Sequence, residues 1–227
     1  ELPKSEIKLK YWRKPNLELK SKYKSVLITG GAQRIGKSIA KYLAESGYNV
    51  AIQYNKSHKK ANDLMDYFKN SKIKFAAYKF DFEKGKNINN FYQKVIQDFG
   101  DFEILINNAS TFDFDTIKTS DEKTFNKNFN VNLKAPFFLS QSFVKNLGKK
   151  NGLIINILDQ RVNNITPYFT SYTLSKSALL TLTKSLSLSL APKVRVNGIS
   201  PGPTLMSKNQ DSTQFKRQIL RTPLKKQ

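Results

Sequence analysis

The fold of this chain is decided by residues 26–36, which read VLITGGAQRIG. A short apolar run precedes a glycine-rich turn, and the turn opens a segment whose apolar residues recur at helical spacing until Gly47. Small residues let the backbone of such a turn approach a pyrophosphate, whose charge is met by free N–H groups and the helix dipole. The glycine spacing differs from the G-x-G-x-x-G fingerprint, so the turn alone is equally consistent with a structural role. A nucleotide is nevertheless the first ligand to expect.

Short apolar runs alternate with helical patterns along the rest of the chain, which is typical of a parallel sheet covered on both faces. A second helical pattern ends at Gly100, as the first ends at Gly47. The strand-like runs are Val26–Ile28, Val50–Tyr54, Phe75–Phe80, Ile104–Ile106, Leu153–Leu158 and Val194–Ile199. The sequence therefore predicts an α/β fold, a single doubly wound (Rossmann-like) domain with a parallel sheet.

The length of 227 residues and the hydrophobic content of 39% suit one domain with a full core, which we place at residues 25–227. Residues 1–24 hold Pro3, Pro15 and many lysines, and they read as a basic N-terminal extension that is either disordered or docked through Trp12. No apolar run approaches the roughly 18 residues of a membrane span, and the N-terminus has no apolar signal core. We predict a cytoplasmic protein without membrane contact.

Composition excludes some chemistry. The chain has no cysteine, and its single histidine, His58, cannot build a metal site alone, so we expect neither disulfides nor a metal. The net charge of +22 would normally suggest a nucleic acid partner. The lysines are spread along the chain without interleaved aromatic residues, however, so we expect no nucleic acid. The positive field should instead attract phosphorylated or carboxylated small molecules.

Four further motifs follow the glycine turn. They are Asn107-Asn108-Ala109-Ser110 after the fourth strand-like run, Asn132 in a helical pattern, Tyr172-x-x-x-Lys176, and Pro201-Gly202-Pro203-Thr204 after the sixth run. Together with the turn, this set resembles the short-chain dehydrogenase/reductase family, and the likeness runs from about Lys24 to about Leu224. The resemblance implies an oxidoreductase that uses a nicotinamide cofactor.

Tyr172 and Lys176 form the predicted centre of catalysis. Because they are four residues apart they share a helix face, and an ammonium near a phenol lowers the pKa of the tyrosine toward working pH. Tyr172 then becomes a usable proton donor, although an isolated pair of this kind is more often a helix-surface pair. The resemblance further implies that Lys176 binds the nicotinamide ribose and that Asn132 holds a water that relays protons to Lys176.

The end of the second strand-like run decides between the two nicotinamide cofactors. An acid there would bond the ribose 2′-hydroxyl and repel a 2′-phosphate, but this chain has Gln53-Tyr54-Asn55-Lys56-Ser57. Arg34, Lys56 and Ser57 can form a cationic pocket for that phosphate, although Lys56 can equally be one more solvated lysine. We therefore predict NADPH. The predicted cofactor-binding residues are Gly30, Arg34, Ile35, Gly36, Asn55, Lys56, Ser57, Asp81, Asn108, Ala109, Lys176, Pro201 and Gly202.

Two of these residues have roles taken from the resemblance. Asp81 matches the family's adenine-contacting aspartate, and an ordinary helix N-cap is the competing interpretation. Asn108, within the Asn-Asn-Ala run, lies beside the cofactor in the family, where that run braces the central sheet; a turn at the strand end is the alternative.

Asp159 narrows the substrate, because most members of the family carry a serine at this position. An aspartate there resembles the pteridine reductases and the dihydromonapterin reductases. Ser110 and Phe112 agree, since in pteridine reductases the matching serine bonds the pterin and the matching phenylalanine stacks on it. The alternatives are that Asp159 is a turn residue neutralised by Arg161, and that Phe112 only fills the core. The resemblance implies the catalytic residues Asn132, Asp159, Tyr172 and Lys176, and the substrate-binding residues Ser110, Phe112, Asp159 and Tyr172.

The predicted function is reduction of a dihydropterin or folate substrate, with a hydride from NADPH and a proton through Tyr172 with Asp159. The alternatives are a 3-oxoacyl or small-carbonyl reductase of the same family and, from another class, a catalytically weak nucleotide- or nucleic-acid-binding protein. The resemblance implies a homotetramer or homodimer, and a mobile lid from Ser200 to about Thr213. Related chains continue beyond Thr222-Pro223-Leu224 into a last helix and strand. If Gln227 is a true terminus, the sheet is expected to lack its last strand and to have an uncovered edge; if the chain was trimmed there, the enzyme is expected to be intact.

Overall fold

The computed structural model describes residues 25–206, 211–223 and 225. The predicted extension, residues 1–24 with Trp12, lies outside this part of the chain, as does part of the predicted lid. The strands are β1 (Ser25–Thr29), β2 (Asn49–Tyr54), β3 (Phe75–Lys79), β4 (Ile104–Asn107), β5 (Gly152–Ile157) and β6 (Val194–Ile199). The α-helices are α1 (Arg34–Glu45), α2 (His58–Phe68), α3 (Ile88–Phe99), α4 (Glu122–Phe129), α5 (Ala135–Asn146), α6 (Thr170–Ser189) and α7 (Ser212–Leu220). Short helical segments are η1 (Phe82–Lys84), η2 (Asn130–Lys134) and η3 (Gln160–Val162).

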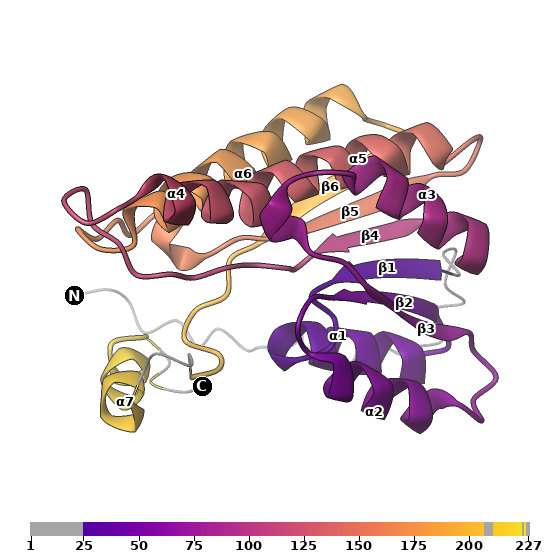
Figure 1. Ribbon diagram of the computed structural model, residues 1–227, viewed down its shortest axis with the longest axis horizontal. Helices are drawn as coiled ribbons and strands as arrows, with labels where there is room; N and C mark the ends of the chain where they lie inside the picture. Colours follow the sequence, from indigo (N-terminus) through magenta and orange to yellow (C-terminus); the bar gives the residue numbers. More distant parts are fainter. Residues whose placement is uncertain (1–24, 207–210, 224, 226–227) are drawn as a thin grey trace, which may run out of the picture.

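The strands form one parallel sheet in the order β3-β2-β1-β4-β5-β6 (Figure 1). Each strand begins and ends within a residue of its predicted bounds, which confirms the predicted α/β fold. The described residues contain no strand beyond β6, so β6 and β3 are the edges of the sheet as it is seen here. None of the described helices is both long enough and apolar enough to span a bilayer.

Helices cover both faces of the sheet, and the strands supply apolar side chains to both. α1 and α2 lie on one face, and α3, α5 and α6 lie on the other (Figure 1). Within β1, Val26 and Ile28 belong to the core under α1 and α2, whereas Leu27 between them belongs to the core under α3 and α5. This alternation within a continuous apolar run is the reason that the strands show no polar face in the sequence.

The glycine turn is packed tightly between β1, β2 and β4. Gly30 has a φ of +62°, and a Cβ on it would lie 2.9 Å from Cα of Ala109. The N–H of Gly30 donates to Oε1 of Gln53 at 2.9 Å. A Cβ on Gly36 would overlap the carbonyl oxygen of Gly30 and approach Nδ2 of Asn108 to 2.5 Å. The glycines are therefore required by contacts within the protein itself, before any ligand is considered.

We predict that Gly36→Ala lowers the free energy of unfolding by about 1–3 kcal/mol in the absence of NADPH, because the added methyl group meets backbone atoms that cannot rotate away. Urea denaturation followed by circular dichroism measures this. Lys37→Ala, at the next and exposed position of α1, is the matched control and should change the free energy of unfolding by less than about 0.5 kcal/mol. Equal effects of the two substitutions would contradict the steric explanation.

Candidate active site

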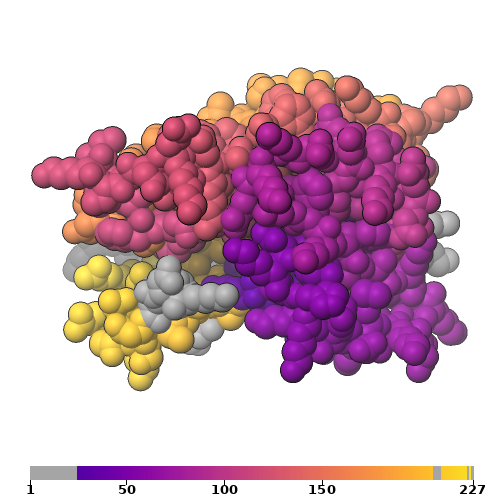
Figure 2. Space-filling model, in the orientation of Figure 1, coloured from indigo at the N-terminus to yellow at the C-terminus, as the bar shows by residue number. Residues whose placement is uncertain are grey.

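A cavity of about 670 Å³ lies at the carboxyl ends of β1, β4, β5 and β6. It adjoins β1 and β4, the point at which the strand order reverses and where open α/β sheets bind ligands. α7 contributes Gln214, Phe215 and Gln218 to its wall. In Figure 2 this C-terminal segment, in yellow, stands beside the indigo N-terminal half and below the magenta region that contains α4. The volume is in the ordinary range for a small-molecule site.

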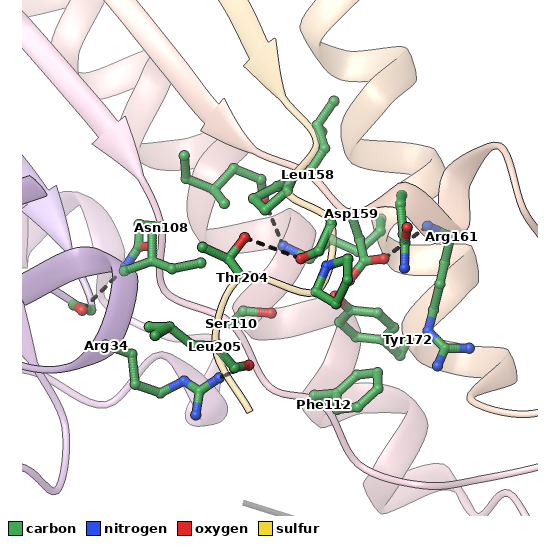
Figure 3. A pocket seen from close by; sticks show the side chains of 18 of the residues that line it. Arg34, Asn108, Ser110, Phe112, Leu158, Asp159, Arg161, Tyr172, Thr204 and Leu205 are labelled. Carbon is green, nitrogen blue, oxygen red and sulfur yellow. Dashed lines mark hydrogen bonds between the residues drawn. The ribbon is translucent and has the colours of Figure 1, made fainter. Parts of the chain in front are cut away.

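Most of the predicted site residues line this cavity. They are Gly30, Arg34, Ile35, Gly36, Asn108, Ala109, Ser110, Phe112, Asp159, Tyr172, Lys176, Pro201 and Gly202. Figure 3 shows Arg34 and Asn108 at one end, and Asp159, Tyr172, Arg161 and Phe112 gathered at the other. The predicted residues that do not line it are Asn55, Lys56, Ser57, Asp81 and Asn132. The predicted cofactor-binding residues thus lie mainly at one end of the cavity, which we call the cofactor-like end. The predicted catalytic and substrate-binding residues lie mainly at the other, the catalytic end.

The start of α1 suits a phosphate group. Its N-cap residue, Gln33, makes no side-chain cap, and the first helical hydrogen bond runs from the N–H of Lys37 to the carbonyl of Gln33 at 3.1 Å. The N–H groups of Arg34, Ile35 and Gly36, which precede that bond, belong to residues that line the cavity. Backbone donors and the positive helix end therefore face the place predicted for the pyrophosphate, so this turn fits the group that the sequence predicts.

Arg34 contacts the loop that follows β6. Its φ of +54° places it in the left-handed region, and its guanidinium donates to the carbonyl oxygens of Met206 at 2.6 Å and Leu205 at 3.1 Å. The predicted partner of this side chain was the 2′-phosphate of NADPH. In this structure the guanidinium holds the loop of the predicted lid against α1, and its role toward a phosphate stays a prediction.

The residues predicted to contact the adenine and the 2′-phosphate of the cofactor lie just after β2 and β3. The side chain of Asn55 donates to Oδ1 of Asp81 at 2.9 Å, and the same oxygen accepts the N–H of Glu83 at 3.0 Å. Asp81 is therefore the N-cap of η1, which was the competing interpretation of this residue. Lys56 is exposed. Contacts of Asp81, Lys56 and Ser57 with a cofactor stay predictions.

The Asn-Asn-Ala run braces the centre of the sheet, as the resemblance implies. Nδ2 of Asn107 donates to Oδ1 of Asn156 at 2.8 Å, directly across the β4–β5 pair. Nδ2 of Asn108 donates to the carbonyl of Thr29 at 2.9 Å and to that of Gly30 at 3.1 Å. The hydroxyl of Thr29 in turn accepts the N–H groups of Asn108 and Ala109, each at 2.9 Å. The glycine turn is therefore tied to the end of β4 by a closed set of hydrogen bonds.

At the catalytic end, a carboxylate, a phenol and an ammonium converge. Asp159 follows β5, and its Oδ2 accepts the hydroxyl of Tyr172 at 2.6 Å. Its Oδ1 accepts the backbone N–H of Arg161 at 2.8 Å, so Asp159 is also the N-cap of η3. Nζ of Lys176 donates to the carbonyl of Ile157 at 2.8 Å. Asp159 is thus both a turn residue and the partner of Tyr172, one role for each carboxylate oxygen, but among the described residues Arg161 forms no ion pair that would neutralise it.

The predicted direction of the pKa shift of Tyr172 is wrong for this structure. Burial raises the pKa of Tyr172 above its usual range, and the charge and hydrogen bond of Asp159 raise it further. Arg161 and Ser110 lower this pKa, but by less. Burial also lowers the pKa of Lys176 to about 8, against a smaller opposing effect of Asp159. The four-residue spacing predicted a shared helix face, but it did not reveal that both side chains are buried beside a carboxylate.

Asn132 is fully buried in η2, a π-helical segment between α4 and α5. Its Nδ2 donates to Oγ of Ser175 at 3.0 Å and to the carbonyl of Thr111 at 3.2 Å, and its Oδ1 accepts the N–H of Thr111 at 3.0 Å. All of these partners belong to the protein, so the side chain joins the β4–α4 connection to α6. The water relay that the resemblance implies for Asn132 stays a prediction.

An aromatic wall, formed by Phe112, Phe169 and Tyr172, closes the catalytic end. Phe112 stacks on Phe169 with 4.2 Å between ring centroids and 6° between planes, and meets the ring of Tyr172 edge-on at 4.7 Å. Phe169 has a φ of +60°, which is unusual for a bulky residue and is maintained only where the surroundings fix it. Sequence reasoning missed Phe169. Its place directly before the Tyr172 helix was the only available signal.

Asp115 is a second residue that sequence reasoning missed. It is buried, and both of its carboxylate oxygens accept the N–H of Ser171, at 3.1 and 3.3 Å. Its carbonyl accepts the N–H of Phe169 at 2.7 Å. An acid from the β4–α4 connection thus caps the start of α6, one turn before Lys176, and fixes where Tyr172 enters the cavity.

Comparisons with known proteins show the family of this chain. Residues 24–217 match the short chain dehydrogenase family. The chain is 35% identical over 183 residues to an uncharacterized oxidoreductase of Thermotoga maritima, covering 80% of this chain and 72% of the relative. It is 31% identical over 181 residues to the 3-oxoacyl-(acyl-carrier-protein) reductase FabG of Staphylococcus epidermidis, covering 79% and 74% of the two chains. The chain therefore belongs to the short chain dehydrogenase family, a family of oxidoreductases.

A solved structure also resembles this chain in fold and sequence. The crystal structure of FolM alternative dihydrofolate reductase 1 from Brucella canis, complexed with NADP, superposes with a TM-score of 0.85 at 38% sequence identity. The match covers 89% of this chain and 81% of that one. The cofactor bound in that neighbour agrees with the NADPH predicted from the end of the second strand-like run.

The lowered pKa of Lys176 predicts a pH-dependent stability. The unfolded chain binds a proton at this lysine up to about pH 10.5, whereas the folded protein releases it near pH 8, so folding is favoured as pH rises between these values. Relative to Lys176→Met, the wild-type protein should gain about 1–2 kcal/mol of unfolding free energy between pH 8 and pH 9.5. Urea denaturation across this range measures the difference.

The matched control is Lys184→Met, which removes a lysine from an exposed position of the same helix. It changes the net charge equally without touching the cavity. If the wild type gains as much unfolding free energy between pH 8 and pH 9.5 relative to Lys184→Met as it does relative to Lys176→Met, the buried ammonium is not the source of the pH dependence.

Proposed function

We propose that this protein reduces the ring of a dihydropterin or dihydrofolate with NADPH. The observation that carries the proposal is the 2.6 Å hydrogen bond between the Tyr172 hydroxyl and the Asp159 carboxylate, in a cavity walled by Phe112. A carboxylate can accept the amino and ring N–H groups of a pterin, and an aromatic face suits a planar ring. The likeness to a FolM alternative dihydrofolate reductase supports the same substrate class.

The cofactor-like end would hold NADPH through residues already described. The N–H groups at the start of α1 would meet the pyrophosphate, and Arg34 with Lys56 and Ser57 would meet the 2′-phosphate. Lys176, whose ammonium lies beside the end of β5, would bind the nicotinamide ribose. The bound cofactor would supply a hydride to the substrate. Choosing NADPH over NADH rests on the basic groups near β2 and on the absence of an acid from Gln53–Ser57.

The substrate ring would use the face of Phe112 that Phe169 leaves uncovered. A ring has two faces, and the parallel stack at 4.2 Å occupies one of them. Ser110 is exposed in the same cavity and can bond the edge of a ring placed there. Phe112 is therefore not only core filling, because it is half-buried and lines the cavity.

The proton would come from Tyr172 and Asp159 acting as a pair. Since the pKa of Tyr172 is raised, the phenol is protonated at neutral pH and can donate. A phenolate left beside the Asp159 carboxylate would be strongly disfavoured, so donation requires that a proton return to the pair. Asp159 is only half-buried and can take that proton from solvent. In this mechanism Tyr172 delivers the proton and Asp159 replenishes it.

A 3-oxoacyl or small-carbonyl reductase is the second candidate, favoured by the 31% identity to a FabG reductase. Such a substrate would need Tyr172 as the proton donor, but it offers no ring N–H groups for Asp159 to accept. Substitutions at Asp159 should therefore distinguish the two candidates.

We expect NADPH to be oxidised when the purified protein is given dihydrobiopterin, dihydromonapterin or dihydrofolate under anaerobic conditions, and to be oxidised faster than NADH. Absorbance at the nicotinamide band measures the initial rates. A ketone and a 3-oxoacyl thioester serve as comparison substrates. Turnover of these two without turnover of any pterin or folate would reject the proposed substrate class.

We expect Tyr172→Phe to lower kcat by about 10²–10⁴-fold while NADPH affinity, measured by fluorescence titration, is retained, because only the donated proton is removed. Asp159→Ala should lower kcat for a pterin far more than kcat for any carbonyl substrate. Asp113→Ala is the matched control, since Asp113 lines the same cavity but pairs with Lys127 at 2.7 Å. Survival of full activity in Tyr172→Phe would show that the proton donor is a different group.

A further inference from the structure

Arg161 is a cation fixed at the catalytic end of the cavity. Its guanidinium carbon lies 4.7 Å from the ring centroid of Phe169 and 5.4 Å from that of Phe112. Its Nη1 donates to Oγ1 of Thr166 at 2.8 Å. Figure 3 shows the side chain extending beside Tyr172 toward the same wall. Two rings and one hydroxyl therefore hold a half-buried guanidinium in one orientation.

This guanidinium has donors to spare. Within the described part of the chain it forms no ion pair, and Nη1 to Thr166 is its hydrogen bond. The two nearby carboxylates are engaged elsewhere: Asp159 by the Tyr172 hydroxyl and a backbone N–H, and Asp113 by Lys127. A guanidinium carries five N–H donors in a planar fork that matches a carboxylate or a phosphate.

The other cations of the cavity are differently placed. Arg34 donates to two loop carbonyls at the cofactor-like end, and Lys176 is buried against the carbonyl of Ile157. Among the described lining residues, Arg161 is thus the cation that stands beside the aromatic wall with donors unused. Because its orientation is already fixed, binding an anion there would cost little additional conformational entropy.

We propose that Arg161 binds an anionic group, carboxylate or phosphate, on the substituent of the substrate ring, and so selects acidic pterins over neutral ones. This rests on the proposed function, since it takes the ring to lie on Phe112. A ring stacked on Phe112 would place its substituent near the same wall, where the Arg161 guanidinium carbon lies 5.4 Å from the Phe112 centroid. Arg161 would then be a specificity residue that the motifs of the sequence did not indicate.

A purely structural role for Arg161 makes a different prediction. If the guanidinium only buttresses Phe112 and Phe169, its loss would disturb the ring site and lower the activity with every substrate equally. If it binds an anion, its loss would lower the activity with anionic substrates far more than that with neutral ones. The comparison of substrates within one variant therefore separates the two roles.

The test measures kcat/KM at saturating NADPH for three substrates with the same ring. These are dihydrobiopterin, whose substituent is neutral, dihydrofolate, whose substituent ends in carboxylates, and dihydroneopterin monophosphate. Arg161→Gln should lower kcat/KM for an anionic substrate by about tenfold to a hundredfold more than it lowers that for dihydrobiopterin. Arg161→Lys keeps the positive charge but lacks the planar set of N–H donors. Its kcat/KM for an anionic substrate should lie between those of the wild type and Arg161→Gln.

Arg195→Gln is the matched control, because Arg195 is exposed on β6 and does not line the cavity. It removes the same single charge from a chain of net charge +22. It should change none of the three values. The substrate that shows the selective loss identifies the anion: dihydrofolate alone indicates a carboxylate, the monophosphate alone indicates a phosphate, and both indicate the shared chemistry.

A binding measurement keeps this test independent of turnover. Folate and unsubstituted pterin are titrated into the protein without NADPH, and fluorescence quenching gives the two dissociation constants. Arg161→Gln should weaken the binding of folate and not that of pterin. Equal losses for anionic and neutral compounds, or no loss for any, would overturn the role of Arg161. Absence of pterin and folate reduction in the wild-type protein, with folate binding still dependent on Arg161, would instead reject the proposed function alone.

Discussion

The hydrogen bond from Tyr172 to Asp159 is the interaction on which the catalytic end depends, because it joins the end of the sheet to α6, the longest of the described helices, inside the cavity. Asp159 is placed by the end of β5 and by its cap on η3. Tyr172 is placed by the start of α6, which Asp115 caps from a third segment. Three chain segments thus position the Tyr172–Asp159 hydrogen bond. Their packing buries the Tyr172 hydroxyl, and this burial raises the pKa of the phenol.

The fold could be predicted from the sequence because each strand shows itself as a short apolar run of neighbouring residues. In β1 the polar residues Ser25 and Thr29 stand at the two ends, whereas Val26, Leu27 and Ile28 are buried and face both sides of the sheet. This continuous apolar run is what predicts a strand of a parallel sheet. Tyr172, Lys176 and Asp159 were found through spacing and resemblance. Phe169 and Arg161 were not, since their contacts depend on the path of the β5–α6 connection. The direction of the pKa shift of Tyr172 was predicted wrongly for a related reason. Residue spacing identifies neighbours on a helix, but the burial that raises this pKa depends on the packing of the whole fold.

The electrostatics of the cavity differ from the charge of the whole chain. A net charge of +22 suggests a uniform positive field, yet two of the cations that line the cavity are held by neutral carbonyl oxygens. A carbonyl orients an ammonium or guanidinium without cancelling its charge, whereas a carboxylate would. The positive charges of Arg34, Lys176 and Arg161 are therefore not neutralised by an ion pair within the described residues, and they can attract an anionic ligand. The carboxylates that face them, Asp159 and Asp113, each have a defined partner.

Polar contacts fix the register of α6 in addition to its apolar packing, and they hold Tyr172 and Lys176 in a defined orientation toward the cavity. Hydroxyls of Ser171, Ser175 and Thr183 share one face of the helix at multiples of four residues, and each bonds a buried asparagine side chain. Their partners, Asn128, Asn132 and Asn156, come from α4, η2 and β5. Rotating α6 by one residue would break one hydrogen bond of each of these three buried amides, at about 1–3 kcal/mol each. Apolar contacts tolerate small rotations, but this row of hydrogen bonds does not, so the fold holds the reacting side chains through amides that never enter the cavity.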